Sequence, residues 1–463
     1  MNNSLLNTIT SDDQKWNKRW KYNCAIFIIS YIFMGAVTGI TNDSFISYLQ
    51  LTVPDVVKAI PTYGSIATFI TAGILLLVHK FGYKKIILTA PIILSCALLT
   101  CIYSSNTTAI LMANILVNIG AGMFDFIYPL MFTSYTPKEK RTLMFSRILY
   151  CNLISQSILT FLNGKIVVWK FSQSLHTTYD KAAILSENSN KLNSSQFTAY
   201  LNSYRFVLWI ALALTIISLF CLFFLKERVE DYRETAKEKA ERKTENKFDW
   251  HVFANKYVIM WVVIFSIVRF GALLVVPYFP IYLNNFLHIS RGTVSTIITF
   301  QTLGMVLAYF ATPYLEKKFG AIVTIAGATL LCIPLMFIMA NGAMFGSNVA
   351  WIIGITLFFR SGIANASAPI EGSLPLTFVP KDLVPAYNSF MMVTMSLVGI
   401  VTGLFSRFVL LRTDAGYGRA YYIASGIYAF SMILLLAIFT KKYNRSLDKE
   451  PPKESKEETI PAN

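Results

Sequence analysis

We single out seven ionisable side chains in the long apolar stretches of this sequence, where charge is otherwise rare. They are Asp43, Asp125, Arg147, Arg269, Arg360, Glu371 and Arg407. Ionisable groups inside a bilayer are costly, so they usually pair with one another or face a water-filled cavity. An arginine keeps its proton and presents a fork of donors that matches carboxylate or phosphate oxygens. A carboxylate that is partly removed from water can instead bind a proton near neutral pH.

Arg269 and Arg360 are expected to lie deepest in the membrane. Each follows the expected start of its apolar stretch by about 12 residues, or roughly 18 Å of helix in a hydrocarbon core about 30 Å thick. We expect the pair to bind an anionic group of a substrate; alternatively, one of them forms a fixed ion pair or caps exposed backbone carbonyls. Tyr278 lies between Pro277 and Pro280, which should bend or break its helix. Tyr278 is expected either to face substrate or to pack against other side chains.

Asp125 and Glu371 are the candidates for proton coupling. Each ends a polar stripe on one face of an expected helix, because residues at i, i+4, i+7 and i+11 point the same way. The stripes are Asn114, Asn118 and Asp125, and Arg360, Ser367 and Glu371. In the alternative interpretation, Asp125 pairs with Arg147 and Glu371 pairs with a basic loop residue. Both carboxylates would then close an inner gate or serve as structural partners.

Asp43 and several uncharged side chains complete the candidate set. Asp43 lies near the outer end of the first expected helix. It is either an external proton or cation site or part of a solvated helix end. Gln156 lies in one stripe with Asn152 and Asn163 in the fifth expected helix. Gln156 and Asn118 are candidates for hydrogen bonds to substrate hydroxyls; alternatively, such groups hold helices together.

Several kinds of chemistry have no motif in this sequence. The six cysteines fall within the expected membrane helices, and the four histidines are scattered. There is no CxxC pair or HExxH motif, and no glycine-rich nucleotide-binding motif precedes a suitable helix. The sequence therefore predicts no catalytic residue, no cofactor-binding residue and no metal site, and we do not expect an enzyme.

The distribution of apolar residues identifies the elements that must position these side chains. Of 463 residues, 54% are apolar and 14% charged, whereas a soluble domain is roughly 45–50% apolar and 25% charged. Apolar stretches of about 20 residues, long enough to span a bilayer as a helix, recur along almost the whole chain. We expect an all-α membrane protein with twelve spans, at 23–47, 57–79, 84–104, 107–133, 143–166, 205–225, 257–284, 292–315, 320–341, 348–378, 386–410 and 419–440.

The net charge of +16 is explained by orientation in the membrane. With both termini in the cytoplasm, most basic residues outside the spans lie on the cytoplasmic side, as the positive-inside rule requires. We therefore expect no nucleic-acid partner and a monomer in the lipid bilayer of the plasma membrane. The expected cytoplasmic segments are 1–22, a charged linker at 226–256 and a tail at 441–463. Six-helix bundles occupy 23–225 and 257–440.

The two halves share loop motifs at corresponding positions. Residues 79–82 are HKFG and residues 317–320 are KKFG, while residues 136–139 are TPKE and residues 379–382 are VPKD. Both pairs lie in equivalent loops, which indicates two parallel six-helix repeats.

This layout, across residues 20–440, resembles the major facilitator superfamily of secondary transporters. The loop between the second and third helices matches the family motif at Lys80, Gly82, Lys84 and Lys85, although His79 replaces its acidic residue. The Gly-Pro pattern and the fourth-helix arginine typical of drug exporters in the family have no match here.

The resemblance implies that helices 1, 4, 7 and 10 line a central cavity and that two bundles rock about it. We therefore expect secondary active transport of a small organic anion or zwitterion, coupled to protons. One alternative is a proton-driven multidrug efflux antiporter. Another is a transporter-like membrane sensor or binding protein without turnover.

Overall fold

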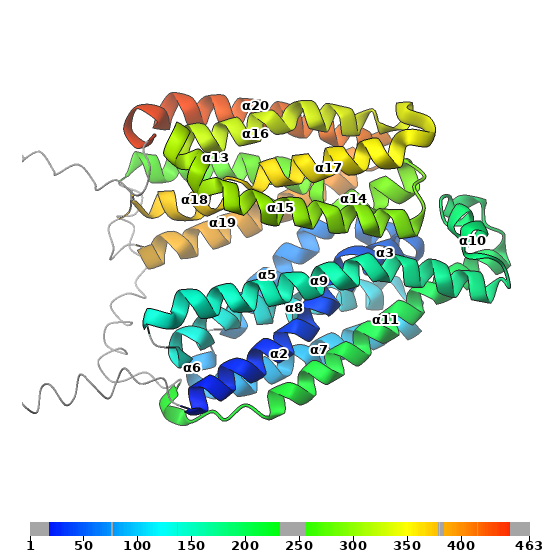
Figure 1. Cartoon of the computed structure of the whole chain (residues 1–463), viewed down its shortest axis with the longest axis horizontal. Coiled ribbons are helices and arrows are strands. Elements are labelled where there is room, and N and C mark those ends of the chain that lie inside the picture. The colour runs from blue at the N-terminus through cyan, green and yellow to red at the C-terminus, as the bar shows by residue number, and fades with distance from the viewer. Residues whose placement is uncertain are drawn as a thin grey trace, which may run out of the picture.

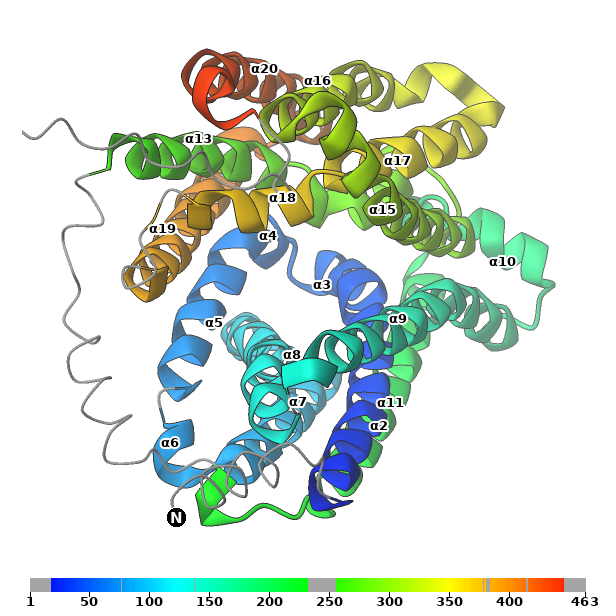
Figure 2. The ribbon, with the colours of Figure 1, turned by 60° about the vertical axis from the view of Figure 1, so that its left-hand side comes forward.

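The computed structural model describes residues 18–75, 77–136, 138–231, 255–377, 379, 384–413 and 415–444. Every regular element in these ranges is a helix, which confirms the all-α prediction for the described part of the chain. The helices form two groups that lie side by side (Figures 1 and 2). Most of the predicted linker 226–256, most of the tail 441–463 and most of the segment 1–22 lie outside the described residues.

The first group, called the N bundle here, comes from the first half of the chain. Its long helices are α2 (Lys18–Ile40), α5 (Ile60–Leu75), α7 (Tyr83–Tyr103), α8 (Thr107–Tyr135), α9 (Lys138–Ser174) and α11 (Ser194–Phe223). Its shorter helical segments are η1 (Thr41–Phe45), α3 (Ile46–Thr52), α4 (Pro54–Val57), α6 (Val78–Phe81), α10 (Tyr179–Leu185), η2 (Ser189–Lys191) and η3 (Val229–Asp231). Within this bundle α2 packs against α9 and α11, and α7 packs against α8.

The second group, the C bundle, repeats this plan. Its long helices are α13 (Lys256–Leu273), α15 (Arg291–Phe319), α16 (Ala321–Ala340), α17 (Val349–Asn365), α19 (Val384–Phe405) and α20 (Ala415–Tyr443). Its shorter segments are η5 (Val276–Tyr278), α14 (Phe279–Ile281), η6 (Tyr282–Phe286), η7 (Gly342–Asn348), α18 (Ala368–Ser373), η8 (Leu374–Thr377) and η10 (Ser406–Leu410). Here α16 packs against α17 and α20, and α13 packs against α19 and α20.

Ten helical segments in the described ranges are long and apolar enough to cross a membrane, and they coincide with ten of the expected spans. The other two expected spans, 57–79 and 143–166, are also helical. They correspond to α5, which has 16 residues, and to α9, which has 37 residues and carries several charges. The count of twelve spans therefore stays a prediction.

The two halves make the same turn at the repeated loop motif. Gly82 lies between α6 and α7 with φ 92° and ψ 160°, and Gly320 lies between α15 and α16 with φ 87° and ψ 162°. A side chain with a Cβ rarely adopts such positive φ values, so each position needs glycine. The matching conformations support the prediction of two parallel repeats.

The two ends of the molecule differ in what they carry (Figure 1). We call the end where α2 begins and α20 ends the termini side, and the opposite end, where α10 lies, the loop side. The sequence predicts that the termini side faces the cytoplasm.

Irregular backbone interrupts two helices near the loop side. The first helix continues from α2 through a π-helical turn, η1, which contains Asp43. The seventh stops at Leu273 and continues through the short segments η5, α14 and η6, as expected of a helix with Pro277 and Pro280.

Glycines let helices of the two bundles approach closely. α5 packs against α19 and α9 packs against α15. A Cβ on Gly399 of α19 would lie 1.9 Å from Ser65 Oγ, and one on Gly403 would lie 2.5 Å from the Thr62 backbone nitrogen of α5. Thr62 Oγ1 donates a hydrogen bond of 2.9 Å to the Ile400 carbonyl across the same interface. Small residues therefore set the distance between the bundles here.

Candidate functional site

Two neighbouring cavities lie among the helices and share part of their lining. The larger, of about 730 Å³, has walls from both bundles, and the smaller, of about 530 Å³, is lined by the C bundle. Val276, Gln301 and Met305 line both. These volumes suit small organic molecules, and the two cavities together form the candidate site.

Arg360 is a buried cation in the wall of the smaller cavity. It lies on α17, and only 3% of its surface is exposed. Its guanidinium carbon lies 5.5 Å from the centre of the Phe279 ring. Its Nε has no hydrogen-bond partner, and among the described residues no carboxylate forms an ion pair with it. The described residues therefore provide no counter-ion for the charge of Arg360.

Arg269 and Glu371 line the same cavity as Arg360. Arg269, on α13, is exposed, whereas Glu371, on α18, is half-buried and accepts a hydrogen bond of 2.6 Å from Ser367 Oγ. The helix that carries Arg360 ends at Asn365, so Arg360 and Glu371 do not share one continuous helix face. A break before Pro369, rather than the predicted stripe, brings both groups to the cavity.

Asp125 lines the larger cavity and is exposed there. Its carboxylate accepts a hydrogen bond from the Tyr31 hydroxyl of α2. Arg147, its predicted alternative partner, is exposed, lines neither cavity and forms no ion pair with Asp125 among the described residues. In this conformation Asp125 is a cavity-wall carboxylate whose partner is a tyrosine.

Asn118 and Gln156 line the larger cavity, on α8 and α9. Asn118 Nδ2 donates a hydrogen bond of 2.8 Å to the Asn114 carbonyl in the previous turn. Both predicted uncharged site residues thus lie in position to meet a ligand.

Tyr278 lies elsewhere. Its side chain is buried, it lines neither cavity, and its hydroxyl donates a hydrogen bond of 2.9 Å to the Lys58 carbonyl of the N bundle. This placement favours the packing alternative and adds a contact that joins the bundles on the loop side.

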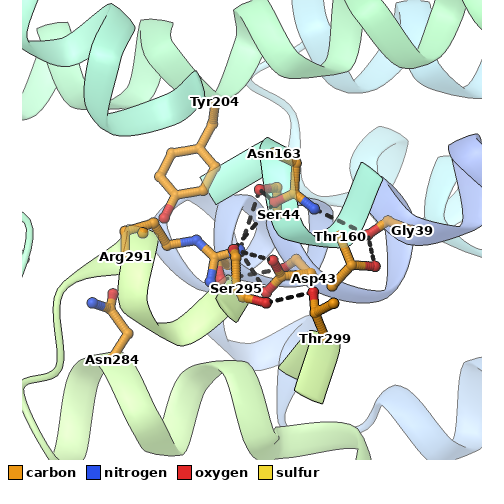
Figure 3. Close-up of polar contacts among 12 residues, drawn as sticks. Gly39, Asp43, Ser44, Thr160, Asn163, Tyr204, Asn284, Arg291, Ser295 and Thr299 are labelled. Atoms are coloured by element: carbon orange, nitrogen blue, oxygen red, sulfur yellow. Dashed lines mark hydrogen bonds and ion pairs between the residues drawn. The ribbon is translucent and has the colours of Figure 1, made fainter. Parts of the chain in front are cut away.

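Asp43 is the one candidate whose surroundings differ most from expectation. It is fully buried, so the solvated helix end is wrong, and its Oδ1 lies 2.6 Å from Nη2 of the equally buried Arg291 of α15. Ser295 Oγ donates a hydrogen bond of 2.6 Å to Asp43 Oδ2, as Figure 3 shows. An ion pair therefore joins the two bundles on the loop side.

Further polar contacts surround this pair (Figure 3). Arg291 Nη2 donates to Ser44 Oγ at 3.2 Å, and Ser44 donates to Asn163 Oδ1 at 2.5 Å. The guanidinium of Arg291 lies 6.0 Å from the centre of the Tyr204 ring. These contacts stabilise the ion pair in an apolar setting, whereas Arg291 Nε and Nη1 are buried without a hydrogen-bond partner.

Sequence reasoning missed Arg291 because the predicted eighth span begins at residue 292. The helix begins one residue earlier, and α10 covers it on the loop side: the Arg291 backbone nitrogen donates to Ser186 Oγ at 3.1 Å, and Asn284 Nδ2 donates to the Ser186 carbonyl at 3.0 Å. A lone acidic residue late in the first helix was the only signal that a buried partner was needed.

Metal binding finds no support in the described residues, since none of their His, Cys, Asp and Glu side chains form a group of three or more that could hold an ion.

The long apolar helices, the two bundles and the cavity between them define a polytopic membrane transporter. The chain belongs to the Major Facilitator Superfamily, whose family model matches residues 22–403 and 261–462. A search of curated proteins finds no match.

Solved structures of several transporters share the fold. A D-xylose-proton symporter superposes with a TM-score of 0.67 at 12% identity, covering 93% of this chain and 99% of that chain. The nucleoside transporter NupG gives 0.65 at 15% identity, covering 90% and 98%. The fucose:proton symporter FucP of E. coli gives 0.53 at 16% identity, covering 90% and 98%.

Proposed function

We propose that this transporter moves a small organic anion together with a proton, by alternating access. The observation that carries the proposal is Arg360, a nearly fully buried guanidinium that lines a cavity and has no counter-ion among the described residues. A buried charge without a partner is costly. A substrate anion in the cavity would supply the missing charge, and the planar fork of Arg360 would orient it. Arg269, in the same wall, would attract the anion as it enters.

The conformation supports alternating access. On the loop side the bundles are joined by the buried Asp43 and Arg291 pair and by the bond from Tyr278 to the Lys58 carbonyl. Asp125, in the cavity, is exposed. With the termini side in the cytoplasm, as the positive-inside rule predicts, this state is closed to the outside and accessible from the cytoplasm. Opening the loop side must then separate Asp43 from Arg291.

Proton coupling is assigned to the carboxylates of the cavity walls. Asp125 accepts a hydrogen bond from Tyr31, and Glu371 accepts one from Ser367. Neither carboxylate has an ion-pair partner among the described residues. A proton on either one would offset the negative charge that a substrate anion brings into the site. Cotransport of the two then carries less net charge through the apolar core.

Efflux of organic cations is the second candidate function. It is favoured by one observation, the exposed carboxylate of Asp125 in the larger cavity, which Phe126 also lines. In that case the cation would displace the proton from Asp125.

The test uses purified protein in proteoliposomes that contain a pH-sensitive dye. A panel of organic anions should drive proton movement in the wild type, and Arg360→Gln should abolish it, whereas Arg360→Lys should retain part of it. Arg407→Gln is the matched control, because Arg407 lines neither cavity and contacts the Phe408 ring at 5.4 Å.

Three results would contradict the proposal. Exchange of dye cations for protons would support efflux instead. Saturable binding without flux would indicate a sensor. Equal loss of protein abundance and transport in Arg360→Gln and Arg360→Lys would assign Arg360 a structural role.

A further inference from the structure

Five amide side chains face the larger cavity. They are Asn42, Asn114, Asn118, Gln156 and Gln301. They come from four elements, η1, α8, α9 and α15, so both bundles contribute. Gln301 also lines the smaller cavity that holds Arg360. The amides therefore continue the site that binds the anion in the function proposed above.

These amides have hydrogen-bonding capacity that the protein does not use. Asn114 Nδ2 and Gln301 Oε1 are buried and have no hydrogen-bond partner. Within the described residues the side chains of Asn42 and Gln156 make no hydrogen bond, and Asn118 makes bonds only to Asn114. Unpaired buried amide groups cost free energy. The two buried unpaired atoms, together with the exposed amides of Asn42 and Asn118 in the same cavity wall, indicate a ligand that completes their hydrogen bonds.

Threonines in the same wall add acceptors. Thr38, Thr68 and Thr302 each donate a hydrogen bond to a carbonyl one turn earlier in its own helix, at 2.9 Å, 3.0 Å and 3.1 Å. A hydroxyl that has used its hydrogen in this way can still accept. The cavity thus offers amide donors, amide acceptors and hydroxyl acceptors close together.

This combination matches hydroxyl groups on the ligand. A hydroxyl both donates and accepts, and so does an amide. A simple fatty acid or an aromatic carboxylate would satisfy Arg360 and leave the amides unpaired.

We propose that the substrate is a polyhydroxylated carboxylate, of the sugar-acid class. Its carboxylate binds Arg360, and its hydroxyls bind the amides of the larger cavity, with Gln301 at the junction. This inference rests on the proposed function, since it takes the anion site at Arg360 as given.

The test compares pairs of acids of similar size, one with hydroxyls and one without; the first pair also differs in the ring oxygen. The probes are D-glucuronate with cyclohexanecarboxylate, D-gluconate with hexanoate, and D-glycerate with propionate, with D-glucose as the uncharged polyol. Binding to the purified full chain is measured by calorimetry and by ligand-induced thermal shift. We expect at least one hydroxylated acid to bind about tenfold or more tightly than its partner, because a site built for hydroxyls rejects ligands that lack them.

Variants then assign this preference to residues. Gln156→Leu and Asn118→Leu should each reduce it, because each variant should weaken binding of the hydroxylated acids more than binding of their unhydroxylated partners. Gln173→Leu is the matched control, because Gln173 lies exposed on the same helix as Gln156 and lines neither cavity. Arg360→Gln should weaken both members of every pair. Unchanged elution volume and unfolding temperature show that a variant folds.

The outcomes separate the two proposals. If both members of each pair bind equally and both depend on Arg360, the sugar-acid assignment is overturned while the anion transporter stands. If no hydroxylated probe binds, the assignment is likewise overturned. If D-glucose binds as well as D-glucuronate and Arg360→Gln changes neither, the anion site fails, and the proposed function fails with it.

Discussion

Asp43 Oδ1 and Arg291 Nη2 lie 2.6 Å apart, in different bundles, and neither side chain is exposed. The pair joins η1 to the first turn of α15 on the loop side. Because each charge is buried against the other, loss of one partner leaves an uncompensated charge in an apolar region. The transport cycle proposed above must break this pair each time the loop side opens.

Single substitutions in this pair should destabilise the observed conformation strongly. Asp43→Asn or Arg291→Gln should each cost about 3–5 kcal/mol, whereas the double variant should cost less than either, because it leaves no buried charge. Hydrogen exchange of the loop-side helices, measured with thermal unfolding in detergent, should report the change.

The control for this prediction is an exposed pair. Asp55 and Lys58 form an ion pair of 3.1 Å in which the Asp55 side chain is 68% exposed, and exposed pairs contribute roughly 0–1 kcal/mol. Asp55→Asn should therefore leave hydrogen exchange unchanged. A double variant as damaged as both singles combined would show that the two residues act independently.

Neutral replacements of the cavity carboxylates should uncouple transport from protons. Asp125→Asn or Glu371→Gln should retain exchange of substrate across proteoliposomes but lose accumulation driven by a pH gradient, because a neutral side chain no longer gains and loses a proton. Asp180→Asn, at an exposed residue of α10, should retain both exchange and accumulation. If both cavity variants still accumulate substrate fully under a pH gradient, these carboxylates do not couple transport to protons, and the result favours the interpretation that they close an inner gate.

A methyl group at the bundle interface should be costly. Gly399→Ala places a Cβ 1.9 Å from Ser65 Oγ, and such overpacking costs about 1–3 kcal/mol. Ser65→Ala should restore part of the lost thermal stability, since it removes the atom in conflict. Gly426→Ala in α20 is the matched control: a Cβ there meets nothing within 4 Å, so stability should hold or rise, as alanine favours helices by up to about 1 kcal/mol. Equal effects at both glycines would contradict this account.

Asp231, at the start of the linker, binds Arg19 of the N bundle, and the contribution of this contact to stability should depend on pH. Burial opposes ionisation of Asp231, but hydrogen bonds from Arg19 and from the Arg228 backbone, with the charge of Arg19, outweigh it and lower the pKa of Asp231 below its ordinary value of 3.8. A lowered pKa stabilises the fold above the ordinary value, and this stabilisation disappears as the pH falls through the lowered pKa.

Asp231→Asn should therefore reduce the free energy of unfolding at pH 7 by about 1–3 kcal/mol, the contribution of a hydrogen-bonded charge. The unfolding temperature should fall accordingly. The difference from the wild type should shrink below pH 3.8. Arg19→Gln should give the same pH profile. A difference that stays constant across this range would mean that the ionised carboxylate does not contribute.

The sequence by itself determined the properties that depend on local pattern. Apolar stretches of helical length placed the membrane helices, and prolines marked the break in the seventh helix at Pro277 and Pro280. The loop motifs that end at Gly82 and Gly320 predicted two repeats, and the structure gives both glycines the same positive-φ conformation. Counting residues along a helix also singled out Arg269 and Arg360, and both line the smaller cavity.

Only the tertiary structure decided which side chains meet across the bundles. Arg291 as the partner of Asp43, Tyr31 as the partner of Asp125 and the bond from Tyr278 to the N bundle join helices far apart in the chain. Helical periodicity gives the face of each helix but neither its neighbour nor its vertical offset against that neighbour, and both are set by the packing of all the helices at once. For this reason the sequence indicated which residues could bind an anion and protons, whereas their grouping into one site followed from the fold.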